Sequence, residues 1–253
     1  MTNTIFITGA SSGIGEAICL YFSSKGWNCI ITGRRIEKLT AIAESCMSTY
    51  NNQILPLQLD ISKEENIRTV VENLPKEWQT INVLVNNAGT LIGLQSFSQG
   101  KIEDWMEMID TNYKGSLLIT KYLSPYLIQS KGHIFFIGSL SAKEYYKNGH
   151  VYCSTKHAID SLSKCIRIDM LPYEVKVTTI HPGYVKTEIP NHIYKYDDPG
   201  KKTFLFEGYT PLESEDIAST IYYCSTLPSH VCINELSISS VHQASTFDIY
   251  KTY

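Results

Sequence analysis

The chain has 253 residues, of which 43% are hydrophobic and 19% are charged, and its formal net charge is -3. Such a composition predicts one globular domain, residues 1–253, with a sizeable core. The near-balanced charge offers no basic surface to a phosphate backbone or an anionic membrane, so we expect neither nucleic acid nor a membrane as a partner.

The chain also lacks the features of a secreted or membrane protein. Its first apolar run, Ile5-Phe6-Ile7, has no cationic residue before it, and nowhere do about twenty apolar residues follow one another. We therefore expect a cytoplasmic protein. The cysteines show no Cys-x-x-Cys spacing, which predicts buried, reduced thiols and no metal site. They are Cys19, Cys29, Cys46, Cys153, Cys165, Cys224 and Cys232.

Short β-branched and apolar runs alternate along the chain with longer amphipathic segments. This alternation predicts a doubly wound α/β fold of the Rossmann type, with a seven-stranded, mainly parallel sheet covered by helices. The predicted strands are Thr4–Thr8, Cys29–Thr32, Ile54–Leu59, Val83–Val85, His133–Ile137, Val175–Ile180 and Ile233–Ile238. The predicted helices begin near Gly13, Ile36, Lys63, Ile102, Tyr152 and Leu212.

The first strand runs directly into a glycine-rich turn, Gly9-Ala10-Ser11-Ser12-Gly13-Ile14-Gly15, which an amphipathic helix follows. Glycines let the backbone approach a ligand closely, and the free N–H groups of the helix N-terminus attract a phosphate. A glycine-rich turn without a ligand is the alternative, but the place in the first strand-to-helix turn favours a dinucleotide site. The candidate cofactor residues here are Gly9, Ser11, Ser12, Gly13, Ile14 and Gly15.

The second predicted strand ends at Gly33 and is followed by Arg34 and Arg35. An acidic residue at this position would bond the adenosine ribose and repel a 2′-phosphate, whereas guanidinium groups bind that phosphate. Two solvated arginines at a helix start are the alternative. The sequence therefore favours NADP(H) over NAD(H), with Arg34 and Arg35 as phosphate ligands.

Polar residues also follow the third and fourth predicted strands. Asp60 and Ile61 come after one, and Asn86-Asn87 closes the next. The carboxyl ends of parallel strands form the crevice in which open α/β sheets bind ligands, so Asp60, Ile61 and Asn87 are candidate cofactor residues. For Asp60, capping of the helix that begins near Lys63 is an equally good explanation.

Tyr152 and Lys156 lie one helical turn apart and therefore on the same helix face. The spacing alone is weak evidence, because Tyr21 and Lys25 repeat it. Only Tyr152, however, is preceded by a serine, Ser139, just beyond a strand that ends in the same crevice. A phenol, an ammonium group and a hydroxyl gathered there predict acid–base chemistry.

Between Tyr184 and Tyr209 the chain is polar and aperiodic, with many Tyr, Lys, Asp and Pro residues. A long stretch without regular structure in a compact domain is usually functional. We expect a lid over the crevice.

Together these residues resemble the short-chain dehydrogenase/reductase family from Thr4 to about Ile238. The matching motifs are Thr8-Gly9-Ala10-Ser11-Ser12-Gly13-Ile14-Gly15, Asn86-Asn87-Ala88-Gly89, Asn112, Ser139, Tyr152 with Lys156, and Pro182-Gly183 with Thr187. Within the family, Leu74-Pro75-Lys76-Glu77-Trp78, Met108-Ile109-Asp110-Thr111-Asn112 and Gly33–Arg35 look like the NADP-dependent 3-hydroxy acid (serine and allo-threonine) dehydrogenases.

The resemblance implies an oxidoreductase that transfers a hydride between NADP(H) and the CH-OH or carbonyl carbon of a small substrate. Tyr152 would exchange the proton, Lys156 would lower the phenol's pKa and bond the nicotinamide ribose, Ser139 would hold the reacting oxygen with Tyr152, and Asn112 would position a relay water. Pro182, Gly183, Val185 and Thr187 would complete the cofactor site. A homotetramer is also implied, with the helices from Ile102 and Tyr152 pairing across an interface.

A 3-hydroxy acid such as serine, or the matching semialdehyde, is the expected substrate. The alternatives are a carbonyl or 3-oxoacyl reductase and, in another class, a non-catalytic NADP(H) sensor, which would need neither Ser139 nor the Tyr152/Lys156 pair. The segment from Leu140 to Lys147 is bulkier and more charged than expected in the 3-hydroxy acid subgroup. From their positions in the sequence, three lysines are candidates to bind a substrate carboxylate: Lys143, Lys147 and Lys186.

Overall fold

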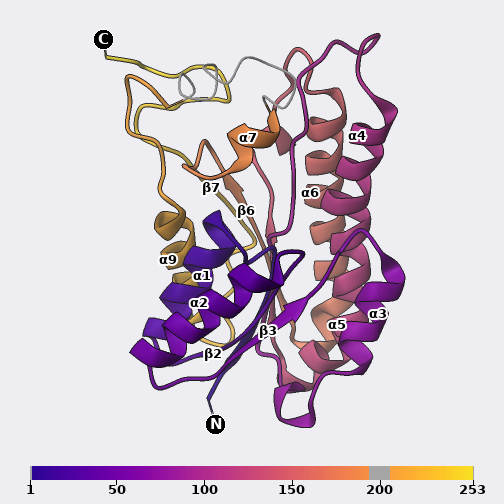
Figure 1. Ribbon diagram of the computed structural model, residues 1–253, viewed down its shortest axis with the longest axis vertical. Coiled ribbons are helices and arrows are strands. Elements are labelled where there is room, and N and C mark those ends of the chain that lie inside the picture. Colours follow the sequence, from indigo (N-terminus) through magenta and orange to yellow (C-terminus); the bar gives the residue numbers. More distant parts are fainter. Residues whose placement is uncertain (1, 194–205, 253) are drawn as a thin grey trace.

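The computed structural model describes residues 2–193 and 206–252. Seven strands form one sheet in the order β3-β2-β1-β4-β5-β6-β7, and every pairing in the described sheet is parallel (Figure 1). The strands are β1 (Thr4–Thr8), β2 (Asn28–Gly33), β3 (Ile54–Gln58), β4 (Val83–Asn86), β5 (His133–Ile137), β6 (Lys176–Pro182) and β7 (Glu235–Ile238). The predicted doubly wound α/β fold is confirmed.

Helices cover both faces of the sheet (Figure 1). One face carries α1 (Gly13–Ser24), α2 (Ile36–Thr49) and α9 (Ser214–Ser225). The other carries α3 (Glu64–Glu72), α4 (Ile102–Met108), α5 (Ser116–Ser130) and α6 (His150–Met170). Three-residue helical turns occur at η1 (Lys76–Trp78), η3 (Leu140–Ala142) and η4 (Leu171–Tyr173).

Successive residues of the central strands pack into two separate hydrophobic cores, one on each face of the sheet. Ile5 and Ile7 of β1 pack on the side of α1, α2 and α9, whereas Phe6 between them packs on the side of α3, α5 and α6. Phe135 and Phe136 divide in the same way, and all five side chains are fully buried. Burial on both faces explains why these strands read as continuous apolar runs in the sequence.

Several boundaries differ from the sequence prediction. Three helices begin within one or two residues of the expected positions, with α3 starting at Glu64, α6 at His150 and α9 at Ser214. The helix that begins at Ile102 does not end with α4, because the wider turns of η2 (Ile109–Gly115) join it to α5. A π-helical segment of this kind is rare and often marks a functional site.

The predicted lid, Tyr184–Tyr209, contains a short helix, α7 (Ile189–Ile193), so the expectation of a stretch without regular structure was wrong for this part. Its start is anchored, since Val185 forms a parallel bridge with Leu212. Residues 194–205 of the predicted lid lie outside the described residues.

All seven cysteines are free thiols, and most are buried as predicted, but Cys165 is exposed and Cys232 is only partly buried. Across residues 2–193 and 206–252, no helix has the length and apolar character needed to cross a bilayer.

Candidate active site

A cavity of about 680 Å³ lies at the carboxyl ends of the strands. This volume is typical of cofactor and small-molecule sites, which range from about 300 to 1,000 Å³. Most of the predicted cofactor residues line it, namely Gly9, Ser11, Ser12, Gly13, Ile14, Arg34, Arg35, Asp60, Ile61, Asn87, Tyr152, Lys156, Pro182, Gly183, Val185 and Thr187. The structure thus brings these predicted residues together around one cavity.

The turn between β1 and α1 requires glycine at two positions. Gly9 and Gly13 have φ angles of 67° and 58°, in the left-handed region that side chains disfavour. Gly15 has a different role, because it lies behind the cavity wall, where a Cβ would meet Asn87 Nδ2 at 2.6 Å. Gly15 therefore allows α1 to approach the end of β4 closely.

Asn87, just after β4, is hydrogen-bonded to the glycine-rich turn. Its Nδ2 donates to the carbonyl oxygens of Thr8 and Gly9 at 2.9 and 3.0 Å. The Thr8 hydroxyl in turn accepts from the backbone N–H groups of Asn87 and Ala88, both at 3.0 Å. These bonds fix the point at which the strand order reverses between β1 and β4, where open α/β sheets bind ligands.

The two adjacent arginines have different environments. Arg35 crosses to the glycine-rich turn, where its Nε and Nη2 donate to the hydroxyls of Ser11 and Ser12 at 3.1 and 2.7 Å. Arg34 is more exposed, and its Nη1 lies 3.5 Å from the Glu107 carboxylate. Both side chains line the cavity, and of the two only Arg35 is hydrogen-bonded to the glycine-rich turn in the described structure.

Glu188, which sequence reasoning missed, also lines the cavity. Its carboxylate lies 2.9 Å from Arg35 Nη1 and 3.2 Å from Lys38 Nζ. The hydrogen bond from Arg35 lowers the pKa of Glu188 to about 2. Nothing local in the sequence signals this contact, because Glu188 and Arg35 are far apart along the chain.

Asp60 does not cap α3, because Lys63 occupies the N-cap position. Its Oδ1 instead accepts from the backbone N–H and the hydroxyl of Ser62, at 3.0 and 2.7 Å. Asp60 and Ile61 both line the cavity, so the capping explanation for Asp60 was wrong, and its role toward a cofactor stays a prediction.

The helix α6 presents Tyr152 and Lys156 to the cavity. Lys156 is 7% exposed; its Nζ donates to the carbonyl oxygen of Ile137 at 2.9 Å and lies 5.7 Å from the centre of the Tyr152 ring. Ser139, just beyond β5, lines the same wall, and its hydroxyl accepts from the N–H of Ser141 at 3.1 Å. Phenol, ammonium and hydroxyl are thus brought together as the sequence predicted.

Burial is the main cause of the pKa shifts of Tyr152 and Lys156. It raises the pKa of Tyr152 to about 12, against a smaller lowering by the hydrogen bond with Ser139, and it lowers the pKa of Lys156 to about 8. Burial thus outweighs the lowering by Ser139, and the predicted lowering of the phenol's pKa by Lys156 stays a prediction. At neutral pH the phenol is protonated.

Asn112 lies in the π-helical segment η2, is 2% exposed and stands behind the cavity wall. Its amide holds both backbone groups of Thr90, accepting from the N–H at 2.7 Å and donating to the carbonyl at 2.8 Å. Its Nδ2 also donates to the Thr155 hydroxyl at 3.1 Å. Asn112 thus links α6 to Thr90, which lines the cavity.

The fold and this site can be compared with known proteins. The family model described as short chain dehydrogenase matches residues 3–197. This chain belongs to the short-chain dehydrogenase family. The matched part contains β1 to β6 and all four residues predicted to act in catalysis.

Individual members of the short-chain dehydrogenase family match nearly the whole chain. Serine 3-dehydrogenase from Rhizobium radiobacter is 35% identical over 252 residues, which are 99% of each chain. The NADP-dependent 3-hydroxy acid dehydrogenase YdfG from Salmonella typhi is 37% identical, with 95% of this chain and 96% of that protein covered. The closed form of a serine dehydrogenase complexed with NADP+ superposes with a TM-score of 0.91 at 34% identity, covering 98% of this chain and 100% of the other.

One part of this short-chain dehydrogenase's cavity was not predicted. Gln243, Phe247 and Lys251, from the segment after β7, line it together with Ser139 and Tyr152. Gln243 accepts from the N–H of Tyr184 at 2.8 Å and so joins this segment to the start of the predicted lid. The three lysines proposed for a substrate carboxylate do not line the cavity in the described structure: Lys143, Lys147 and Lys186.

Proposed function

We propose that this enzyme oxidises a small 3-hydroxy acid such as serine at its β-carbon with NADP+, or reduces the matching semialdehyde with NADPH. The observation that carries the proposal is the meeting of Ser139, Tyr152 and Lys156 in the cavity that the glycine-rich turn and Arg35 also line. The 3-hydroxy acid dehydrogenases among its relatives, at 35% and 37% identity, support the substrate class.

The residues present fit a dinucleotide phosphate. Backbone N–H groups at the start of α1 would hold the pyrophosphate beside Gly9 and Gly13. Both positions have positive φ angles that favour glycine, and glycine leaves room for a ligand next to the backbone. Arg35, with Arg34 near it, would bind the 2′-phosphate, and Gly33 offers no carboxylate to compete. Lys156 would hold the ribose next to the nicotinamide. When bound, the cofactor supplies or accepts the hydride.

The chain's own residues manage the proton and the reacting oxygen. In reduction, Tyr152 donates its phenolic proton to the carbonyl oxygen, for which a pKa of about 12 keeps the proton available at neutral pH. The Ser139 hydroxyl donates a second hydrogen bond to the same oxygen. Lys156, in its charged form, stabilises the phenolate that remains. Asn112 holds Thr90 and Thr155 of α6 through its side-chain amide.

Lys251 is our candidate for the substrate carboxylate. It lines the cavity, and its Nζ lies 5.8 Å from the centre of the Tyr209 ring. A hydrogen bond to a charged group contributes about 1.5–3 kcal/mol, so Lys251→Met should raise the KM for the hydroxy acid about tenfold or more. Lys186→Met is the matched control, because Lys186 pairs with Glu213 at 3.6 Å on the surface, and it should leave KM unchanged.

A second candidate is a carbonyl reductase that acts on larger, apolar substrates. The observation in its favour is the set of apolar and aromatic side chains that line the cavity with Ser139, which are Leu91, Leu94, Tyr146, Tyr184, Phe206 and Phe247. Such a wall suits an aliphatic or aromatic substituent better than a carboxylate.

A panel of purified-enzyme assays separates the two candidates. NADP+ reduction would be measured with 3-hydroxy acids and simple alcohols, and NADPH oxidation with aldehydes and ketones. The proposal expects the highest kcat/KM with a 3-hydroxy acid. Turnover restricted to apolar ketones would favour the second candidate, and no turnover with any compound would overturn both.

We also propose a homotetramer in which α4 and α6 pair with their copies. Large apolar side chains are exposed near both helices, among them Ile102 (66%), Met106 (48%) and Ile168 (68%). Such residues are typical of subunit interfaces. Light scattering after size exclusion should give four times the 28.6 kDa chain mass, and a monomer would refute the proposal.

A further inference from the structure

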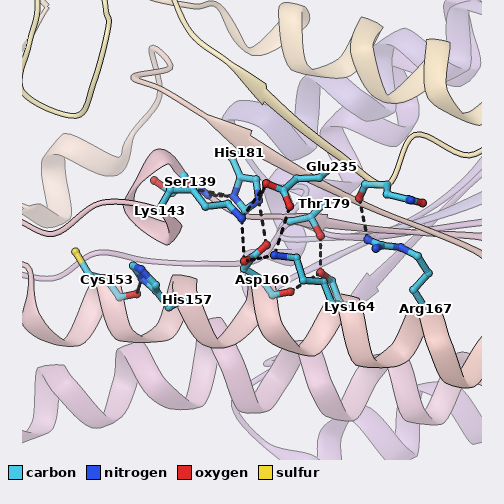
Figure 2. Close-up of polar contacts among 12 residues, drawn as sticks. Ser139, Lys143, Cys153, His157, Asp160, Lys164, Arg167, Thr179, His181 and Glu235 are labelled. Carbon is cyan, nitrogen blue, oxygen red and sulfur yellow. Dashed lines mark hydrogen bonds and ion pairs between the residues drawn. The ribbon is translucent and has the colours of Figure 1, made fainter.

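The strand β6 carries His181, whose imidazole is completely buried beside Ser139. Its Nδ1 lies 3.4 Å from the backbone nitrogen of Ser139 and 3.1 Å from that residue's carbonyl oxygen (Figure 2). The ring fills space that Gly138 leaves open, since a Cβ there would meet His181 Cε1 at 2.8 Å. His181 therefore packs directly against the turn that presents the Ser139 hydroxyl.

The other ring nitrogen, Nε2, faces two carboxylates. It lies 3.4 Å from Asp160 Oδ1 on α6 and 3.8 Å from Glu235 Oε1 on β7. Lys143, just after η3, bridges these carboxylates at 2.9 and 2.8 Å, and Lys164 on α6 approaches them at 2.7 and 3.5 Å. Figure 2 shows these side chains converging between α6 and the strands.

The cluster is better explained as an ion-pair network than as a metal centre. Asp160, His181 and Glu235 do offer ligand atoms within 4.8 Å of one another. Two ammonium groups, however, already lie against the carboxylates and balance their charge. A metal cation would have to displace both lysines and would be repelled by them.

The surroundings fix the protonation of His181. Burial and the charge of Lys143 lower its pKa, against the opposing effect of Asp160 and Glu235, so the ring is neutral at physiological pH. A neutral imidazole carries one proton, and the facing carboxylates favour it on Nε2. In the described chain, Nε2 and Asp160 Oδ1 are buried without another hydrogen-bond partner, which also directs the proton between them.

With the proton on Nε2, Nδ1 can accept a hydrogen bond, and the backbone N–H of Ser139 needs such an acceptor. The carbonyl of Ser139 already accepts from the N–H of Ala142 at 2.9 Å. The N–H of Ser139 donates to His181 Nδ1, and a buried N–H without an acceptor is costly. The 3.1 Å contact between Nδ1 and the Ser139 carbonyl oxygen would suit the opposite tautomer, so the assignment rests on the carboxylates that face Nε2 and on the Ser139 N–H.

We propose that His181 is a positioning residue for Ser139: its Nδ1 accepts the serine N–H, and Asp160, Glu235 and Lys143 hold the ring and its proton in place. This inference rests on the proposed function, in which Ser139 binds the reacting oxygen. Protonation of Nδ1 at acid pH would remove the acceptor and loosen the serine. His181 thereby adds an acidic limb to the pH profile of turnover.

Two variants of the full-length enzyme test the proposal. His181→Asn places an amide oxygen near the position of Nδ1 and does not titrate, whereas His181→Leu has no acceptor. We expect His181→Leu to lower kcat about ten- to a hundredfold while the KM for NADPH stays unchanged, since a small displacement of a catalytic group has effects of this order. His181→Asn should retain most of kcat and lack the acidic limb of the wild type.

His133→Leu is the matched control. His133 is also a buried histidine in the sheet, with Nε2 2.7 Å from the Thr178 hydroxyl, but it lies at the amino end of β5, away from the cavity. It should change thermal stability without changing kcat or the pH profile. A wild-type kcat in His181→Leu, or an equal loss of kcat in all three variants, would overturn the proposal.

A second measurement is independent of activity. The nitrogen chemical shifts of ¹⁵N-histidine-labelled enzyme, with the His181 signals identified from the Asn variant, report which ring nitrogen carries the proton. Protonated Nε2 with unprotonated Nδ1 at neutral pH supports the proposal, and protonated Nδ1 refutes it. A wild-type enzyme without NADP-linked turnover would refute the proposed function. The nitrogen chemical shifts would still show whether His181 Nδ1 can accept a hydrogen bond from Ser139.

Discussion

The Arg35 guanidinium and the Glu188 carboxylate lie 2.9 Å apart although 153 residues separate them in the chain. The pair joins the start of α2 to the residue before α7 at the rim of the cavity. A carboxylate thus already occupies one side of the cation that we assign to the 2′-phosphate. The cofactor phosphate and Glu188 therefore compete for Arg35.

Glu188→Gln should tighten NADP(H) binding about two- to fivefold, because a partly exposed ion pair contributes up to about 1 kcal/mol and its loss also removes a repulsion. Arg35 stays oriented in this variant by Ser11 and Ser12. Binding would be measured by NADPH fluorescence titration, with NAD(H) affinity unchanged. Glu107→Gln, beside Arg34, is the control with a smaller effect, and weaker NADP(H) binding in Glu188→Gln would show that the carboxylate supports the site.

Removing the arginines should weaken NADP(H) binding unequally. Arg35→Ala should raise the NADP+ Michaelis constant about ten- to a hundredfold, since a hydrogen bond to a charged group contributes about 1.5–3 kcal/mol. Arg34→Ala should have the smaller effect, because that side chain is 62% exposed and loosely held. Steady-state kinetics with both cofactors would test this order, and an unchanged NADP+ Michaelis constant in the double variant would exclude both arginines from the phosphate site.

The cofactor preference should invert in the double variant Gly33→Asp with Arg35→Ala. A Cβ at Gly33 would lie 3.5 Å from the Ser11 hydroxyl, an ordinary contact, so a side chain fits there. The new carboxylate would accept from the ribose hydroxyls of NAD and repel a 2′-phosphate. The ratio of kcat/KM values for the two cofactors measures the change, and a ratio that still favours NADP+ would contradict the assignment.

Tyr152→Phe should reduce turnover by about 10²–10⁴ while NADPH still binds, because the change deletes only the proton donor. The control is Tyr21→Phe. Tyr21 has the same Tyr-x-x-x-Lys spacing, but it lies on α1 and its ring contacts that of Tyr222 on α9, with the centroids 5.6 Å apart. That variant should keep nearly full activity. More than a tenth of wild-type activity in Tyr152→Phe would rule out the assigned role.

The reductive reaction should slow above about pH 8. Burial lowers the pKa of Lys156 to about 8, so the ammonium group is charged below this pH and neutral above it. The phenol of Tyr152 stays protonated over the same range, since its pKa is raised to about 12. We expect log kcat/KM to fall with a slope near -1 above pH 8 and Lys156→Arg, which does not titrate there, to lose this limb. A wild-type limb that begins near pH 10 would contradict the assignment.

The sequence predicted the parts of the site that depend on local pattern. The glycine-rich turn and the Tyr152/Lys156 pair each occupy one short segment, so their spacing carries the information. The seven-stranded, mainly parallel sheet followed from the repeated alternation of strand and helix. These features need no knowledge of contacts between distant segments.

What the sequence did not predict depends on tertiary contacts. Glu188 meets Arg35, and His181 meets Asp160 and Glu235, only after distant segments pack together. The raised pKa of Tyr152 was not predicted for the same reason, because burial is a property of the folded chain. The C-terminal part of the cavity, with Gln243, had no motif to reveal it.

The parallel sheet has a consequence for how this enzyme acquires its site. Each strand pairs with partners that are distant in sequence, as Ile5 does with Val83, and the cavity wall runs from Thr8 to Lys251. Such non-local pairing slows folding, and the unfolded chain has no cofactor site. Cofactor therefore binds the native state alone and stabilises it by mass action, by about 2.7 kcal/mol at a hundredfold excess over Kd. The concentration of NADP(H) would thus affect the stability of the folded chain as well as its turnover.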